Sequence, residues 1–149
     1  MKTLKIKNNQ VLPLVAFLTG LSLGGKESRS RSRFKKLLAD RITEIEEERV
    51  RLCEKYSTKN KKGEILYLDK DDKETTNKTK ESKYNIKDVE EFNKELLEYV
   101  SEEFLIDISP ANNETVYAVK DIILNVKREF KGEEADVYDE LCSAFENIK

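Results

Sequence analysis

The sequence has no histidine and no tryptophan, and it has only two cysteines, two prolines and one methionine among 149 residues. Without histidine, the chain lacks the usual general base at neutral pH and the commonest metal ligand. Histidine-dependent catalytic triads are therefore excluded, and we expect no enzyme activity, no metal and no cofactor. Cys53 and Cys142 lie too far apart in the sequence to form a metal-binding pair, which predicts free thiols in the reducing cytoplasm.

The chain also lacks an apolar run long enough to cross a bilayer. Residues 11–25 are largely apolar and follow a basic start, as in a secretory signal. The polar start, however, extends to Gln10, and the apolar run is shorter than a membrane-spanning helix. We therefore expect folded structure in this segment and no membrane partner.

Charge is abundant but unevenly distributed. The hydrophobic fraction is 38% and the charged fraction 39%, so the core must be built from amphipathic elements, mainly helices. Residues 1–41 contain ten Lys or Arg against two Asp or Glu, whereas the rest of the chain is acidic overall. This polarity predicts a charged contact, either with an outside partner or between two parts of the fold.

The spacing of apolar residues predicts a mainly helical α+β fold in a single domain, residues 1–149. Helical spacing predicts five helices, one of them long, at residues 9–19, 28–56, 88–103, 114–130 and 133–147. Alternating patterns predict strands at residues 3–7, 63–70, 83–87 and 104–108. The second and third of these strands would form a small hairpin with a mobile tip at 71–82, because that stretch has no apolar residue to pack.

The segment GLSLGGKE, residues 20–27, nearly matches the phosphate-binding loop of nucleotide-binding proteins. Glu27 takes the place of the hydroxyl that would bind magnesium, and the preceding segment is predicted to be a helix rather than a strand. A nucleotide-binding enzyme is therefore a distant alternative, and the glycines are better explained by a turn between helices.

The segment SRSRSRFKK, residues 28–36, contains the densest group of cations. In an extended chain its three arginines would point the same way; in a helix Arg29 and Arg33 share one face, and Arg31 falls on the apolar side. The candidate protein- or anion-binding residues are Arg29, Arg31, Arg33, Lys35 and Lys36. Acidic contacts, internal or on a protein partner, are favoured over nucleic acid, because no free aromatic residue lies between these cations for stacking.

Three segments resemble a family of uncharacterised small proteins of tailed phages and prophages, encoded near the tail and lysis genes. The segments are KESRSRSRFKKLL (26–38), VKDIILN (119–125) and FKGEEADVYDELCSAFE (130–146). The resemblance spans nearly the whole chain, is weakest at 57–87, and implies a phage origin rather than an enzyme. Its basic and acidic segments have complementary charge, which suggests Arg29 or Arg33 facing Glu133, Glu134 or Asp136.

Together these features predict a non-enzymatic phage-type accessory protein in the host cytoplasm that acts by binding a host or phage protein. It would serve virion assembly or interfere with a host or defence protein. The alternative is a nucleic-acid-binding protein that uses residues 26–36. The long helix should bury its apolar stripe either within the fold or against a second copy, so a homodimer is a further expectation.

Overall fold

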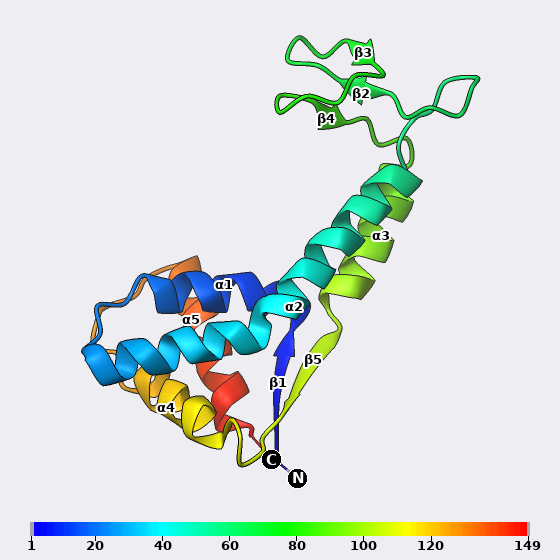
Figure 1. Cartoon of the computed structure of the whole chain (residues 1–149). Coiled ribbons are helices and arrows are strands. Elements are labelled where there is room, and N and C mark those ends of the chain that lie inside the picture. Colours follow the sequence, from blue (N-terminus) through cyan, green and yellow to red (C-terminus); the bar gives the residue numbers. More distant parts are fainter. Residues whose placement is uncertain (1, 149) are drawn as a thin grey trace. The chain divides into compact units, whose positions relative to one another are not determined.

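The computed structural model describes residues 2–148 and consists of two compact units (Figure 1). Of the described residues, unit 1 contains 2–43 and 101–148, and unit 2 contains 44–100. The long second helix of the chain begins in unit 1 and ends in unit 2. The prediction that all residues form one domain stays a prediction.

Five helices and five short strands form within the described residues, which confirms the predicted mainly helical α+β class. The helices are α1 (Asn8–Thr19), α2 (Gly25–Lys55), α3 (Val89–Val100), α4 (Asn113–Leu124) and α5 (Glu133–Glu146). The strands are β1 (Thr3–Lys7), β2 (Tyr67–Leu68), β3 (Glu74–Thr75), β4 (Lys83–Tyr84) and β5 (Glu103–Asp107).

In unit 1, α1, α4, α5 and the first part of α2 pack with an antiparallel sheet of β1 and β5. The alternation in β1 that predicted a strand buries Leu4 and Ile6 on one face of the sheet, opposite Ile106 and Phe104 of β5. Further core residues come from all four helices: Val11, Leu14, Leu18, Phe34, Leu38, Val116, Val119, Ile122, Ile123, Leu141, Cys142 and Phe145.

The rings of Phe34 in α2 and Phe145 in α5 lie at the centre of this core. Both side chains have no exposed surface, and their ring centroids are 5.8 Å apart. Burying an aromatic side chain of this size stabilises a fold by roughly 2–3 kcal/mol. Helices α2 and α5 therefore face each other through their apolar sides.

Arg31 joins the first turns of α2 to the end of α1. Its Nη1 donates to the carbonyl oxygens of Leu18, at 2.8 Å, and of Leu21, at 2.6 Å. Carbonyl groups at the C-terminal end of a helix lack intrahelical partners and favour a nearby cation. This contact explains why an arginine occupies the apolar side of a helix that the sequence predicts to be amphipathic.

Unit 2 contains the last three turns of α2, helix α3 and a small three-stranded sheet in the order β3–β2–β4. Strands β2 and β4 form the predicted hairpin, and β3 adds a strand within the stretch predicted as its mobile tip. Asp88 begins α3 as predicted, because its Oδ1 accepts a hydrogen bond from the backbone N–H of Glu91 at 3.2 Å.

Three helix boundaries differ by three or more residues from the sequence prediction: the start of α2, at Gly25 instead of residue 28, and the ends of α3 and α4. Helix α4 ends at Leu124, six residues before the predicted end at residue 130, because the side chain of Tyr138 takes the carbonyl oxygen of Ile123 as its acceptor at 2.6 Å. Gly132, with φ of 63°, lies immediately before α5. A positive φ costs glycine little, so it suits this sharp entrance to α5.

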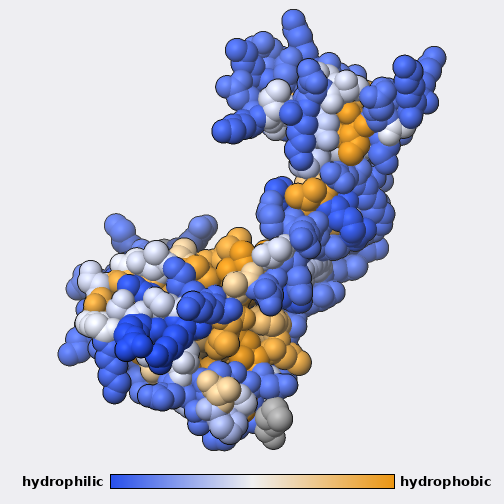
Figure 2. All heavy atoms as spheres, in the orientation of Figure 1, coloured by the Kyte–Doolittle hydropathy of each residue, from blue (hydrophilic) through white to orange (hydrophobic). Residues whose placement is uncertain are grey.

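Apolar side chains gather on the visible face of unit 1, whereas the same view of unit 2 is mostly hydrophilic (Figure 2). Among residues 2–148, no helix combines the length and the apolar character needed to cross a membrane.

The contacts of Arg31 predict that Arg31→Ala lowers the free energy of unfolding by about 2 kcal/mol, because hydrogen bonds from a charged group contribute about 1.5–3 kcal/mol. Arg33→Ala removes an equal charge from the exposed side of the same helix and should change stability by less than about 0.5 kcal/mol. Urea denaturation followed by circular dichroism measures both. Equal effects of the two substitutions would contradict the capping role.

Candidate functional site

Four cations lie on one exposed face of α2, and we call them the basic stripe: Lys26, Arg29, Arg33 and Lys36. Their spacing of three and four residues places them in one row, because an α-helix has 3.6 residues per turn. This row lies on the side of α2 opposite Phe34 and Leu38, which are fully buried. The basic stripe therefore faces away from the core of unit 1.

Two of the five predicted cations do not belong to the basic stripe. Arg31 is committed to the end of α1, and Lys35 points the same way, with its Nζ donating to Thr19 Oγ1 at 3.1 Å. Sequence reasoning missed Lys26 because it placed the helix start at residue 28, whereas α2 begins at Gly25. The three-residue spacing between Lys26 and Arg29 is the signal that could have found it.

The suggested contact between Arg29 or Arg33 and the acidic segment is not formed. Within residues 2–148, neither arginine makes an ion pair with Glu133, Glu134 or Asp136. Glu134 instead forms an ion pair with Arg128, a closer neighbour in the sequence. The packing of Phe34 against Phe145 gives the physical reason, since it turns the outer faces of α2 and α5 away from each other.

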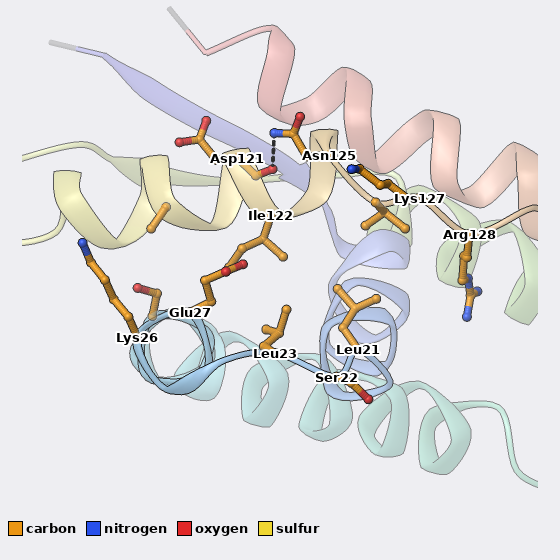
Figure 3. A pocket seen from close by; sticks show the side chains of 13 residues that line it. Leu21, Ser22, Leu23, Lys26, Glu27, Asp121, Ile122, Asn125, Lys127 and Arg128 are labelled. Atoms are coloured by element: carbon orange, nitrogen blue, oxygen red, sulfur yellow. Dashed lines mark hydrogen bonds between the residues drawn. The ribbon is translucent and has the colours of Figure 1, made fainter.

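An open groove of about 770 Å³ lies beside the first turns of α2 (Figure 3). Leu21 and Leu23 point into it from the turn between α1 and α2, and Ile122 points into it from α4. Its charged lining residues are Lys26, Glu27, Asp121, Lys127 and Arg128. The groove thus combines an apolar floor with charges of both signs, and it shares Lys26 with the basic stripe.

A cluster of aromatic rings packs against Arg128, which lines one end of this groove. The rings of Phe130 and Tyr138 stack with their centroids 4.3 Å apart, and Phe17 lies 5.5 Å from Tyr138. The Arg128 guanidinium covers Phe130 at 4.6 Å. Burial and, to a smaller extent, the Cys142 thiol raise the pKa of Tyr138 to about 12, so this phenol stays a neutral hydrogen-bond donor. The contacts of Arg128 with the Phe130 ring and with Glu134 hold its guanidinium in the wall of the groove.

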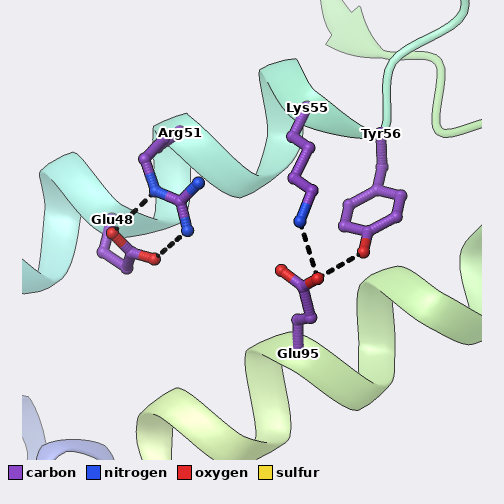
Figure 4. A network of polar contacts seen from close by, with 5 residues as sticks. All are labelled: Glu48, Arg51, Lys55, Tyr56 and Glu95. Carbon is purple, nitrogen blue, oxygen red and sulfur yellow. Dashed lines mark hydrogen bonds and ion pairs between the residues drawn. The ribbon is translucent and has the colours of Figure 1, made fainter.

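The arginines in the second part of α2 differ from the basic stripe because each has a carboxylate partner. Arg49 pairs with Glu46 at 2.7 Å, and Arg51 pairs with Glu48 at 2.5 Å (Figure 4). These hydrogen-bonded arginines lower the pKa of both glutamates. The basic stripe has no such carboxylate partner among the described residues, so its charge remains available to an outside ligand.

Glu95 on α3 contacts the C-terminal end of α2 through Lys55 and through Tyr56, the residue that follows α2. Its Oε1 accepts hydrogen bonds from Lys55 Nζ at 2.7 Å and from the Tyr56 hydroxyl at 2.6 Å (Figure 4). Lys55 and then Tyr56 lower the pKa of Glu95 below its ordinary value of 4.5. Because its pKa is lowered by folding, this carboxylate stabilises the fold at any pH above its unfolded-state pKa. The stabilisation is lost as the pH falls through its folded-state pKa.

We therefore predict that Glu95→Gln lowers the melting temperature at neutral pH, and that the difference from the unchanged protein disappears once the pH has fallen below the lowered folded-state pKa of Glu95, where the carboxyl group is protonated in both states. Glu98→Gln on the same helix is the matched control, and it should have little effect at either pH. Thermal denaturation followed by circular dichroism checks this. A difference for Glu95→Gln that persists unchanged in acid would contradict an electrostatic role.

The chain was compared with protein-family models, with curated proteins and with solved structures, and none of the three comparisons gave a match.

Proposed function

We propose that this protein is a non-enzymatic accessory protein of phage type that acts by binding a protein partner through the basic stripe. Through this binding the protein would serve virion assembly or interfere with a host or defence protein. The phage setting is supported by the resemblance of residues 26–38, 119–125 and 130–146 to a phage family. The absence of histidine supports the non-enzymatic part, because the chain lacks the usual general base.

One observation carries the proposal: four cations in one row on a helix have no carboxylate partner among residues 2–148. Between Lys26 and Lys36 the row extends for about 15 Å, from a rise of 1.5 Å per residue. Such a row favours a partner with an acidic surface, since complementary charge steers association and fixes orientation.

The groove beside the basic stripe favours a protein over a nucleic acid. Its apolar floor suits the side chain of a protein segment, and Glu27 and Asp121 would repel a phosphate backbone. Asp40 lies one helical turn beyond Lys36 and adds a third carboxylate in line with the basic stripe. The only aromatic residue among these cations, Phe34, is buried and is not available to stack with bases.

Nucleic-acid binding is the second candidate, because the density of exposed cations on α2 is the feature that phosphates require. The two candidates differ in salt dependence. Binding through several phosphates loses roughly a thousandfold or more in affinity between about 50 and 200 mM salt. A contact that also buries apolar surface in the groove should weaken much less.

The test is capture of bound molecules from host cells by the tagged protein, with and without nuclease, followed by mass spectrometry. We expect a protein that survives nuclease treatment and whose recovery falls at least about tenfold with Arg29→Ala/Arg33→Ala, as for the loss of two interfacial charge contacts. Arg49→Ala/Arg51→Ala is the matched control: it removes two arginines from the same helix at sites that already have internal partners, and it should not reduce recovery.

Capture that nuclease abolishes, together with steeply salt-dependent binding of DNA or RNA by the purified protein, would overturn this proposal in favour of the nucleic-acid alternative. Equal losses of capture with both arginine pairs would show that the basic stripe is not the contact surface.

A further inference from the structure

Helix α5 carries an exposed row of carboxylates on its outer side, which we call the acidic face: Glu133, Asp136 and Glu140. Their spacing of three and four residues aligns them along α5, opposite the buried residues Leu141 and Phe145. Within residues 2–148, none of the three forms an ion pair, and Glu140 accepts one long hydrogen bond from Gln10 at 3.4 Å.

The acidic face and the basic stripe match in length. Arg29 and Lys36, the ends of the basic row that we compare, are seven residues apart on α2, and Glu133 and Glu140 are seven residues apart on α5. In both helices this is about 10.5 Å. When two such helices lie side by side, three cation–carboxylate contacts can form at once.

These two rows cannot meet within one chain. Helices α2 and α5 contact each other through Phe34 and Phe145, whose ring centroids are 5.8 Å apart in the core of unit 1. Each charged row lies on the side of its helix away from this contact. The complementary charges of the two segments are therefore both exposed to solvent, and no ion pair joins them within residues 2–148.

An open polar hollow of about 610 Å³ lies beside the acidic face and gives room for long side chains. Asp139 and Glu140 line it from α5, and Lys5 and Lys7 line its other wall from β1. No ion pair joins these two lysines to Asp139 or Glu140 within the part of the chain that the structure describes. Glu140 is exposed in this hollow, but Lys5 and Lys7 on the other wall disfavour a second cation there, so Glu133 and Asp136 contribute most of the attraction to a basic partner.

We propose that the basic stripe of one copy binds the acidic face of a second copy of this chain. This inference rests on the proposed function, and it names the acidic protein that the basic stripe recognises. Because the two surfaces are different, the contact is head-to-tail, and each pair of copies keeps one free basic stripe and one free acidic face. Assembly therefore continues beyond the dimer, either to a closed ring or to an open filament.

The test uses two charge-reversal variants in analytical ultracentrifugation at about 50 mM salt, where charge attraction is only weakly screened. Arg29→Glu/Arg33→Glu reverses the basic stripe, and Glu133→Lys/Asp136→Lys reverses the acidic face. The unchanged protein should form oligomers that grow with concentration and dissociate at high salt. Each variant alone should be monomeric, with its dissociation constant raised at least about tenfold.

The equimolar mixture of the two variants gives the sharpest result. The acidic face of the first variant and the basic stripe of the second are intact, so one correct contact can form. We expect the mixture to assemble where each variant alone does not, because the two intact surfaces attract each other and the two reversed surfaces also carry opposite charges. An unchanged protein that is monomeric at all concentrations, or a mixture that stays monomeric while the unchanged protein assembles, would overturn the inference.

Two controls distinguish a loss of self-assembly from misfolding of the variants and from failure of the proposed function. Lysines in the first turn of α5 disfavour the helix, so Glu133→Gln/Asp136→Asn is a second variant that should also weaken assembly without reversing charge. A monomeric protein that still needs Arg29 and Arg33 to capture a cellular protein would refute self-assembly and leave the proposed function standing. Loss of both properties would refute both.

Discussion

The contact between Phe34 and Phe145 determines which charges of unit 1 face solvent. Both rings are fully buried, and they join α2 to α5 through the apolar sides of the two helices. Because side chains on opposite sides of a helix point in opposite directions, the same contact turns the basic stripe and the acidic face outward. The polarity of the sequence is thus not neutralised inside the fold, and this leaves two charged surfaces for intermolecular contacts.

The arginines of α2 differ in their hydrogen-bond acceptors, according to where each lies on the helix. Arg31 lies on the apolar side, and the carbonyl groups at the end of α1 occupy its guanidinium. Arg49 and Arg51, farther along the helix, bind glutamates one turn before them. Arg29 and Arg33 have neither kind of acceptor among the described residues. A run of alternating serine and arginine therefore contains one structural arginine between two that are available for binding.

Much of this arrangement could be predicted from the sequence, because helical spacing is a local property. It predicted the five helices and placed Arg29 and Arg33 together and Arg31 on the apolar side. It could not show where α4 ends, since that depends on Tyr138 reaching back to the carbonyl group of Ile123. The sequence also suggested a contact between Arg29 or Arg33 and the acidic segment that the structure does not contain. Tertiary packing sets how α2 and α5 face each other, and charge complementarity in a sequence does not reveal it.

Arginine-selective modification with phenylglyoxal, read residue by residue by mass spectrometry, shows whether Arg29 and Arg33 are available in the folded protein while Arg31 is bound to the end of α1. In dilute protein at high salt, where self-association is suppressed, the account predicts that Arg29 and Arg33 react at least about ten times faster than Arg31, whose two hydrogen bonds must first break. In denaturant the three should react alike. Equal rates in the folded protein, or protection of Arg29 and Arg33 in the dilute monomer, would contradict the account.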